Sequence, residues 1–226
     1  MRMYRLLIAL VFTTLLVMGC SNKTTTLNSS GNSGESNDPD QVTDKGNKQV
    51  IETVDKSLKD YFLPDGSKAN FLGDGNEFAE LDVTFAMPYE NIVVVHENNG
   101  GVVIRFIYEI EENQITLINH TSVDMNEDFP TLEEIDAMKP EGIYLKKPFE
   151  VGTTFDKWTI TETGVTVETP YQKFENAFVI ESKENNALNR KYFVEGYGEV
   201  KRESIMDVEN NEKFIVTSTL ESVSKP

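Results

Sequence analysis

Apolar and polar residues alternate along several short stretches of the chain, which is the pattern of half-buried β-strands. Residues 81–85 (Leu-Asp-Val-Thr-Phe) follow this pattern with a period of two. Residues 91–96 and 102–110 are rich in β-branched side chains and are separated by an Asn-Asn-Gly-Gly stretch. Asn-Gly between two such runs favours a tight hairpin, because a type I′ turn needs positive φ at both central residues. We therefore predict a hairpin centred on Asn99-Gly100.

The β pattern continues to the end of the chain. Further strands are predicted at residues 114–119, 158–161, 165–169, 174–182, 190–194, 199–205 and 213–223. Roughly ten short strands without repeated strand–helix alternation argue against a parallel sheet. The predicted fold is mainly β, an antiparallel curved sheet or a barrel, with one short inserted helix and a helix near the N-terminus.

Two segments have a helical pattern. Apolar residues recur at spacings of four, four and three over residues 49–61, at Val50, Val54, Leu58 and Tyr61. This spacing places them on one face of a helix. Thr131 and Glu134 have the spacing of a capping box, which predicts a short helix over residues 131–138, ended by Pro140.

The start of the chain has the features of a bacterial secretory signal. Arg2 and Arg5 precede an apolar run, Leu6–Met18, that is shorter than the ~20 residues needed to span a bilayer. The run ends in Val-Met-Gly-Cys, which resembles a lipobox, where a small residue precedes the cysteine that receives the lipid. We predict lipid attachment at the Cys20 thiol, with palmitate among the acyl chains, since two or more chains anchor a protein stably. The alternative is an ordinary cleaved signal with an incidental cysteine.

The chain therefore divides into three predicted parts. Residues 1–19 are the lipoprotein signal peptide. Residues 20–48 are a flexible tether, because Ser, Asn, Thr, Gly and Asp predominate and bury too little surface to offset the conformational entropy of folding. Residues 49–226 form a single β-rich extracytoplasmic domain. The predicted location is the outer face of the cell membrane, reached through the lipid anchor.

Composition excludes several classes of function. The net charge is −17, from 38 acidic and 21 basic residues. Such a balance argues against nucleic acid, whose phosphates need a basic surface. One cysteine and two histidines exclude a disulfide framework and make a site with several thiolate or imidazole ligands improbable. Removal of the signal would leave 19 basic residues and a charge of −19.

Four stretches of the chain after Tyr61 resemble segments of a family of Firmicutes lipoproteins and secreted domains. Residues 75–79 are similar to its Gly-Asn-Glu-Tyr-Ala segment, 98–101 to its central turn, 148–155 to Pro-Leu-x-Val-Gly-Thr-x-Trp, and 169–174 with 192–201 to its Thr-Pro and Tyr-x-x-x-Gly-x-Gly-x-Val-Lys segments. Phe155 stands where tryptophan is usual. The resemblance implies an exported, membrane-anchored, β-rich domain and implies no activity.

Three stretches could suggest a metal or phosphate site. Residues 124–128 (Asp-Met-Asn-Glu-Asp) begin like a calcium loop, but Phe129 and Ile135 occupy the places of the required glycine and glutamate. Residues 73–77 (Gly-Asp-Gly-Asn-Glu) fit an ordinary turn. Residues 196–198 (Gly-Tyr-Gly) lie between predicted strands, without the helix that receives phosphate. We predict an acidic loop and two turns, and neither a metal site nor a cofactor.

The sequence offers no catalytic constellation. No serine nucleophile motif occurs, and Cys20 is committed to the lipid. His96 and His120 could each act as a general base, but no pattern joins either to a nucleophile. Acidic pairs able to hydrolyse glycosides are expected by chance among 38 acids. We therefore predict that the protein is not an enzyme.

Three aromatic residues, Phe149, Phe155 and Trp158, could line a ligand pocket or fill the core, and their strand context favours the core. The predicted function is that of a membrane-anchored lipoprotein with a non-catalytic binding or envelope-accessory domain, whose partner is a wall component or a protein. The alternative is a carrier that holds a small apolar ligand inside a curved sheet. A side-chain-filled barrel would favour the first hypothesis, and a large apolar cavity the second.

Overall fold

Twelve strands form a single antiparallel sheet. The computed structural model describes residues 57–124, 127–184, 186–208 and 212–226. The strands are β1 (Lys68–Asp74), β2 (Leu81–Tyr89), β3 (Ile92–Asn98), β4 (Val103–Ile110), β5 (Gln114–Val123), β6 (Gly142–Lys146), β7 (Thr154–Phe155), β8 (Trp158–Glu168), β9 (Lys173–Glu184), β10 (Ala187–Val194), β11 (Gly198–Asp207) and β12 (Lys213–Ser224). The prediction of a mainly β, antiparallel fold is confirmed.

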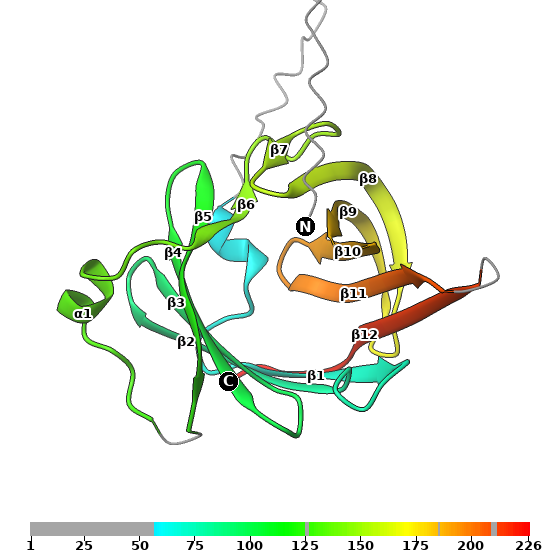
Figure 1. Ribbon diagram of the computed structural model, residues 1–226. Helices are drawn as coiled ribbons and strands as arrows, with labels where there is room; N and C mark the ends of the chain where they lie inside the picture. The colour runs from blue at the N-terminus through cyan, green and yellow to red at the C-terminus, as the bar shows by residue number, and fades with distance from the viewer. Residues whose placement is uncertain (1–56, 125–126, 185, 209–211) are drawn as a thin grey trace, which may run out of the picture. The chain divides into compact units, whose positions relative to one another are not determined.

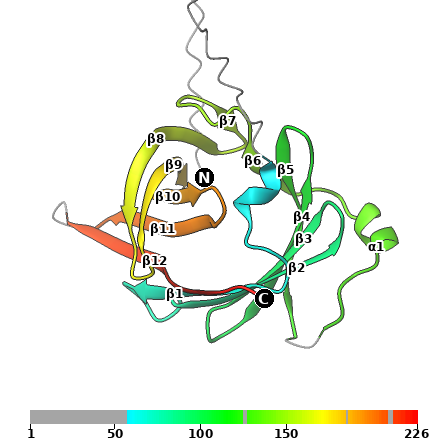
Figure 2. The ribbon, with the colours of Figure 1, turned by 180° about the vertical axis from the view of Figure 1, so that it is seen from behind.

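The sheet consists of two meanders joined by the first and last strands. Hydrogen-bonded neighbours follow the order β6-β5-β4-β3-β2-β1-β12-β11-β10-β9-β8-β7. Strand β1 pairs with β12, with Lys68 opposite Ser224. The sheet curls so that its two free edges, β6 and β7, approach one another (Figures 1 and 2). The result is a nearly closed, barrel-like sheet whose seam lies in the middle of the chain.

A side chain bridges this seam. Asp156 lies in the tight turn between β7 and β8 with a φ of 45°, and its Oδ2 accepts a hydrogen bond of 2.6 Å from the backbone N–H of Ile143 in β6. A Cβ at position 142 would lie 2.6 Å from the same oxygen, so glycine is the residue that fits there. One of the free N–H groups of the β6 edge is thereby paired, which reduces the tendency of an open edge to bind other strands.

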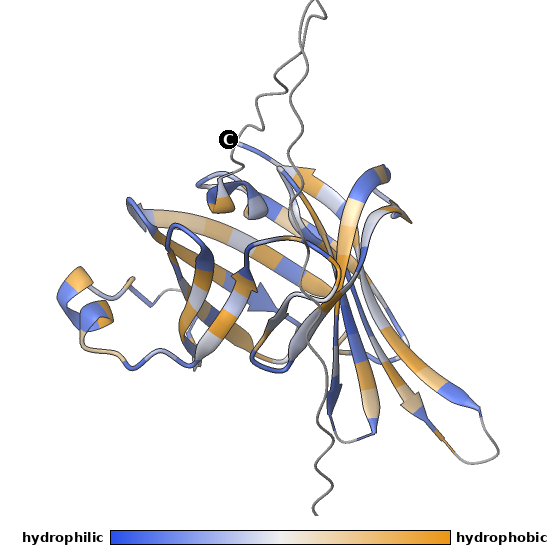
Figure 3. Ribbon diagram, turned by 90° about the horizontal axis from the view of Figure 1, so that it is seen from above, coloured by the Kyte–Doolittle hydropathy of each residue, from blue (hydrophilic) through white to orange (hydrophobic). Residues whose placement is uncertain are grey.

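Aromatic side chains fill the space that the sheet encloses. Ring contacts with centroid separations of 4.6–5.6 Å connect Tyr108, Tyr144, Phe193, Phe178 and Phe149 in turn. The same faces of the strands carry the buried aliphatic residues, and Figure 3 shows apolar and polar positions alternating along the ribbon. The alternation in the sequence therefore reflects one face turned into the enclosed core and one turned to solvent.

The predicted helix over residues 49–61 is described only in its last part. A short 3₁₀ helix, η1 (Leu58–Tyr61), begins after Ser57, whose side chain accepts a hydrogen bond of 3.2 Å from the N–H of Lys59. The segment that follows contributes Phe62 and Leu63 to the buried core. Residues 49–56 lie outside the described residues.

The second predicted helix is confirmed. Helix α1 (Leu132–Asp136) begins at Thr131, and the capping box with Glu134 is formed in both directions. Ile135 of α1 packs on Ile92, Val94, Ile107 and Ile118, which form a second buried cluster on the outer face of β3–β5. This cover explains why both faces of β3 are buried. Within the described ranges, no helix is long and apolar enough to cross a membrane.

Several local predictions need correction. Asn98 pairs with Val103, so the predicted hairpin, which joins β3 and β4, has a four-residue loop, and only Gly100 of the Asn99-Gly100 pair has positive φ (81°). The Asn99 side chain instead accepts hydrogen bonds from the N–H groups of Gly101 and Val102, which replaces the expected type I′ turn. Strands β1, β6 and β7 were not predicted, because they are short or lack clear alternation. The two strands predicted at 158–161 and 165–169 are one irregular strand, β8.

Candidate functional site

Four charged side chains meet inside the curled sheet and form the internal ion network: Glu97, Lys191, Glu199 and Arg202. The guanidinium of Arg202 in β11 binds Glu97 of β3 with two parallel hydrogen bonds, of 2.9 Å from Nη1 and 2.7 Å from Nη2. Its Nε donates to Glu199, which also accepts a hydrogen bond of 2.9 Å from Nζ of Lys191 in β10. Strands β3 and β11 are not neighbours in the sheet. The network therefore connects opposite walls across the interior.

Pairing explains how these charges are tolerated away from bulk water. Lys191 and Arg202 lie directly opposite each other on β10 and β11, where two like charges normally repel. Glu199 lies against both cations and only 6% of its side chain is exposed. Burial raises the pKa of the Glu199 carboxyl, but Arg202 and Lys191 outweigh this effect and hold the pKa below its ordinary value. The two acids and two bases balance, so the network carries no net charge.

Aromatic rings surround the Lys191 end of the network. Nζ of Lys191 lies 5.5 Å from the ring centroid of Tyr144 and 5.8 Å from that of Trp158. These distances are those of cation–π contacts. Burial, reinforced by Glu199, raises the pKa of the Tyr144 hydroxyl well above its ordinary value, so Tyr144 stays neutral and presents an aromatic face to the ammonium.

Two open hollows share the wall formed by Lys157, Trp158 and Lys191. The first, of about 290 Å³, extends over β10 and β11 and is also lined by Arg202. The second, of about 460 Å³, lies at the seam between β6 and β8 and is lined by Phe106, Tyr108, Leu117, His120, Glu141, Tyr144 and Asp156 in addition. We call the second one the seam cavity. Deeper in the core, the hollow beside Glu97 and Arg202 has only about 30 Å³.

His120 and Glu141 contact each other at the edge of the seam cavity. Nδ1 of His120 contacts Oε2 of Glu141, and Oε1 of Glu141 accepts hydrogen bonds of 3.2 Å from the backbone of His120 and the side chain of Asn119. The imidazole also stacks on Phe106, with 5.9 Å between the ring centroids. A carboxylate that orients a histidine is a common element of general-base catalysis. The lining of the cavity contains no serine, threonine or cysteine that this histidine could activate.

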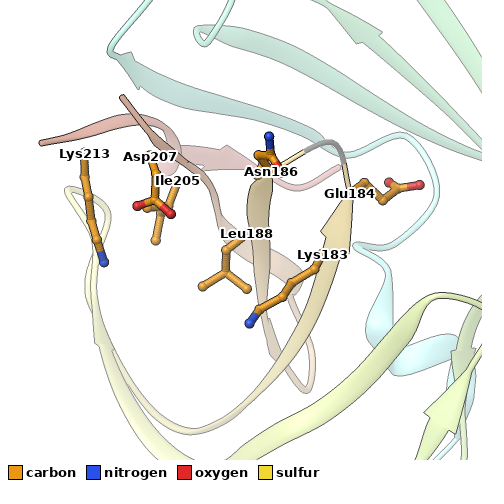
Figure 4. A pocket seen from close by; sticks show the side chains of 8 residues that line it. Lys183, Glu184, Asn186, Leu188, Ile205, Asp207 and Lys213 are labelled. Carbon is orange, nitrogen blue, oxygen red and sulfur yellow. The ribbon is translucent and has the colours of Figure 1, made fainter. Parts of the chain in front are cut away.

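A further hollow of about 640 Å³ lies under the ends of the β9–β10 and β11–β12 hairpins. Figure 4 shows Leu188 and Ile205, which are opposite each other on β10 and β11, pointing to the same side, with Lys183, Asp207 and Lys213 around them. This hollow is separate from the internal ion network and carries no aromatic ring.

Glu127 and Asp128, at the end of the predicted acidic loop, contact an arginine of the sheet. Arg105, with only 8% of its side chain exposed, lies 3.0 Å from a carboxylate oxygen of Glu127 and donates to the carbonyl of Asp128 at 3.2 Å. A guanidinium thus contacts these oxygens from the sheet side. Across residues 57–226, leaving out the undescribed positions, no three His, Cys, Asp or Glu side chains are arranged to hold a metal ion.

The two glycine-rich stretches are turns, as predicted. In the first, Gly75 has a φ of 93° and the Asn76 side chain accepts a hydrogen bond from the N–H of Phe78. In the second, between β10 and β11, Gly196 and Gly198 have φ values of 81° and 77°. A Cβ at position 198 would lie 2.4 Å from the carbonyl oxygen of Tyr61, so this turn packs directly against η1.

The remaining predicted residues are dispersed. Cys20 lies outside the described residues. His96 lies on the outer face near Phe129, and burial together with Arg105 lowers the pKa of its imidazole. The three aromatic residues belong to the core, as the strand context favoured: Phe155 is buried, and Phe149 and Trp158 pack against the same cluster partly buried. Trp158 also lines both open hollows.

Sequence reasoning missed all four members of the internal ion network. The signal was weak, because the positions next to Lys191 and Arg202 on the same face are mixed: Phe193 is apolar, whereas Asn189 and Ser204 are polar. A single charged residue in a strand is usually a surface residue. The partner that changes this interpretation is Glu97, 105 positions away from Arg202, and no local pattern identifies it.

Similarity to known proteins is found at the level of solved structures. No protein-family model matches the chain, and no curated protein matches its sequence. Among solved structures, the chain is similar to a protein inferred to be exported, with a YmcC-like fold, from Bacteroides fragilis, at 14% identity over 73% of this chain and 98% of that one, with a TM-score of 0.44. It is also similar to a protein inferred to be a lipoprotein, from Parabacteroides distasonis, at 13% identity over 73% of this chain and 98% of that one, with a TM-score of 0.44.

Proposed function

We propose that the chain is a membrane-anchored extracytoplasmic lipoprotein whose β-sheet unit is a non-catalytic binding domain. The anchoring rests on the sequence, in which a short apolar run ends at the sole cysteine, Cys20. The binding role rests on one structural observation. The ammonium of Lys191, held by Glu199 and two aromatic rings, lines two open hollows in front of a core filled with side chains.

The filled core favours this proposal over the carrier hypothesis. A carrier needs an enclosed space of several hundred Å³ to remove an apolar ligand from water. The hollow deep in the core has about 30 Å³, far below the ~300 Å³ at which small-molecule sites begin. The larger hollows are open, and charged groups lie on their walls. The ligand is therefore expected to bind at the opening of the sheet.

The anchor is tested by Cys20→Ala. We expect the wild-type chain to incorporate labelled palmitate and to partition into the detergent phase, and the variant to do neither, because the thiol is the nucleophile for lipid attachment. Ser21→Ala is the matched control and should behave as the wild type. A Cys20→Ala chain that still takes up palmitate would show that Cys20 is not the attachment site.

The binding role is tested by the small molecules that the full chain retains when it is purified from membranes in detergent. We expect the wild type to release compounds that Lys191→Met lacks, as measured by mass spectrometry. Lys201→Met is the control, because Lys201 also pairs with one glutamate and contacts one aromatic ring, but projects from the opposite face of β11. Identical profiles from all three chains would contradict a binding role for the hollows around Lys191.

A further inference from the structure

The ammonium of Lys191 has spare hydrogen-bonding capacity inside an aromatic-walled space. An ammonium has three N–H donors, and one of them donates to Glu199 at 2.9 Å. Among the described residues, no other protein acceptor lies within hydrogen-bond distance of this nitrogen. The side chain is 24% exposed, and the residue lines both open hollows. A ligand in either hollow can therefore accept hydrogen bonds from Lys191 without breaking the internal ion network.

The other polar groups of the seam cavity already have partners. The Asp156 carboxylate accepts from the N–H of Ile143, and Glu141 binds His120. Arg202 does not line this cavity and directs its contacts to Glu97 and Glu199. Lys157 pairs with Glu184 and is half exposed at the opening, with Nζ 5.8 Å from the Trp158 ring. Lys191 is thus the inner cation available to a ligand, and Lys157 is a second, outer one.

These features select the charge of the ligand. A cationic ligand would have to compete with Lys191 for the faces of Tyr144 and Trp158 and would be repelled by its ammonium. A phosphate group is usually recognised by the paired donors of an arginine or by several cations. The donors of Arg202 are directed to glutamates, and the outer cation Lys157 is paired with Glu184. A single ammonium with two spare N–H groups matches a carboxylate.

The aromatic walls of the seam cavity determine which shape of apolar group fits between them. Phe106, Tyr108, Tyr144 and Trp158 line the seam cavity. Flat aromatic walls pack best on a flat or cyclic apolar body. The volume of about 460 Å³ lies in the range of natural small-molecule sites, about 300–1,000 Å³. The cavity thus fits a compound with one or two rings.

We propose that the seam cavity binds a small cyclic carboxylate, with its ring against Trp158 and Tyr144 and its carboxylate on the ammonium of Lys191. This inference rests on the proposed function and names the ligand class of the same site. The net charge of −17 repels anions from the molecule as a whole, so binding of a carboxylate depends on direct contact with the Lys191 ammonium.

Trp158 is the only tryptophan of the chain, so intrinsic fluorescence reports on this site directly. The full chain in detergent is titrated with cyclohexanecarboxylate, which does not absorb at the excitation wavelength, and with cyclohexanecarboxamide and cyclohexylamine. We expect a saturable change with the carboxylate and at least about tenfold weaker binding of the neutral amide and of the amine, since a charge-assisted hydrogen bond is lost.

The variants assign this effect to Lys191. Lys191→Met should weaken carboxylate binding at least about tenfold, and Lys157→Met by less. Lys201→Met is the control and should bind as the wild type. Lys191→Arg keeps the charge and the pairing with Glu199, so it should retain binding if Lys191→Met does not fold.

The two proposals fail in different ways. Equal affinity for the carboxylate and the amide in the wild type, or unchanged carboxylate binding by a folded Lys191→Met chain, overturns the ligand class. The proposed function then still stands on the retained compounds. Retained compounds that are identical in the wild type and Lys191→Met contradict the proposed function itself.

Discussion

Strands β10 and β11 carry charged side chains on both faces, and the two sets differ in their surroundings. On the inner face, Lys191, Glu199 and Arg202 form the internal ion network with Glu97. On the opposite face, Arg190 binds Glu181, and Lys201 and Tyr192 bind Glu203; we call these residues the outer ladder. Both sets contain acid–base pairs within β11 and between neighbouring strands. Only the inner set reaches a distant part of the chain.

Lys191 and Lys201 show how closely the two faces match locally. Lys191 lies 2.9 Å from Glu199 and 5.5 Å from the Tyr144 ring, and its side chain is 24% exposed. Lys201 lies 2.7 Å from Glu203 and 5.4 Å from the Tyr192 ring, and its side chain is 25% exposed. The contacts of a residue with its nearest partners therefore do not distinguish the two faces. The difference lies in the aromatic core and in the opposite wall of the sheet.

The largest expected difference between the faces is in the cost of removing an arginine. Arg202→Met would leave two carboxylates, Glu97 and Glu199, without their main partner inside the sheet, and should lower the free energy of unfolding by about 3–5 kcal/mol. Arg190→Met on the outer ladder should cost about 1 kcal/mol or less, because Arg190 pairs with one carboxylate, Glu181, which is more exposed than either carboxylate of Arg202. Urea denaturation of the full chain measures both. Equal losses would show that the inner set is effectively solvated.

A double-mutant cycle sharpens the comparison. The Arg202–Glu97 pair is bidentate and partly desolvated, so Glu97→Gln combined with Arg202→Met should reveal a coupling energy of about 1–3 kcal/mol. The matched cycle with Glu181→Gln and Arg190→Met should give about 0.5 kcal/mol or less. A larger coupling energy for Arg190 and Glu181 than for Arg202 and Glu97 would contradict the expectation that the inner pair is the stronger one.

The pH dependence of stability should depend on Glu199. Burial raises the pKa of this carboxyl, but Arg202 and Lys191 lower it by more, so the folded-state pKa lies below the unfolded one. Such a group stabilises the fold above its unfolded-state pKa, and the contribution is lost as the pH falls through the folded-state pKa. We therefore expect the wild type to lose stability below about pH 5 and Glu199→Gln to show a shallower loss.

Urea denaturation at a series of pH values measures this effect. Glu203 on the outer ladder provides the comparison. Burial raises the pKa of its carboxyl, but hydrogen bonds from Lys201 and Tyr192 lower the pKa by more, so the net shift is also downward. Glu203→Gln should leave the contribution of Glu199 intact. Parallel curves for the wild type and Glu199→Gln would show that Glu199 does not take up a proton on unfolding in this range.

The smallest expected effect is that of salt. The Debye length falls from about 10 Å at 0.1 M to about 3 Å at 1 M ionic strength, and exposed pairs are screened more than enclosed ones. The destabilisation caused by Arg190→Met should therefore shrink in 1 M sodium chloride, whereas that of Arg202→Met should persist. An equal salt dependence of the two losses would indicate that both arginines are similarly exposed to ions.

Much of the fold could be predicted because its signals are local. The alternation of residues 81–85, the β-branched runs and the capping box of Thr131 and Glu134 each depend on residues within one turn or strand, and the structure contains these elements. The errors also have local causes. Strands β6 and β7 are short edge strands, and the loop at Asn99 uses side-chain hydrogen bonds instead of the expected turn conformation.

The candidate site could not be predicted in the same way. Asp156, which bridges the seam, appears in the sequence as an ordinary turn residue, and its partner Ile143 belongs to a strand that was not predicted. Trp158 was identified as an aromatic residue that could line a pocket or fill the core. Its place between two hollows depends on how β8 is positioned against β6 and β10.

The sequence by itself determined the class of fold, the acidic charge, the short helix and the predicted anchor at Cys20, because each follows from composition or from spacing between near neighbours. The tertiary structure alone decided which face of each strand is enclosed, that β1 closes on β12, and that Glu97 meets Arg202. The physical reason is that the free energy of a charged side chain depends on what surrounds it. For the internal ion network, those surroundings are assembled from strands that are far apart in the chain.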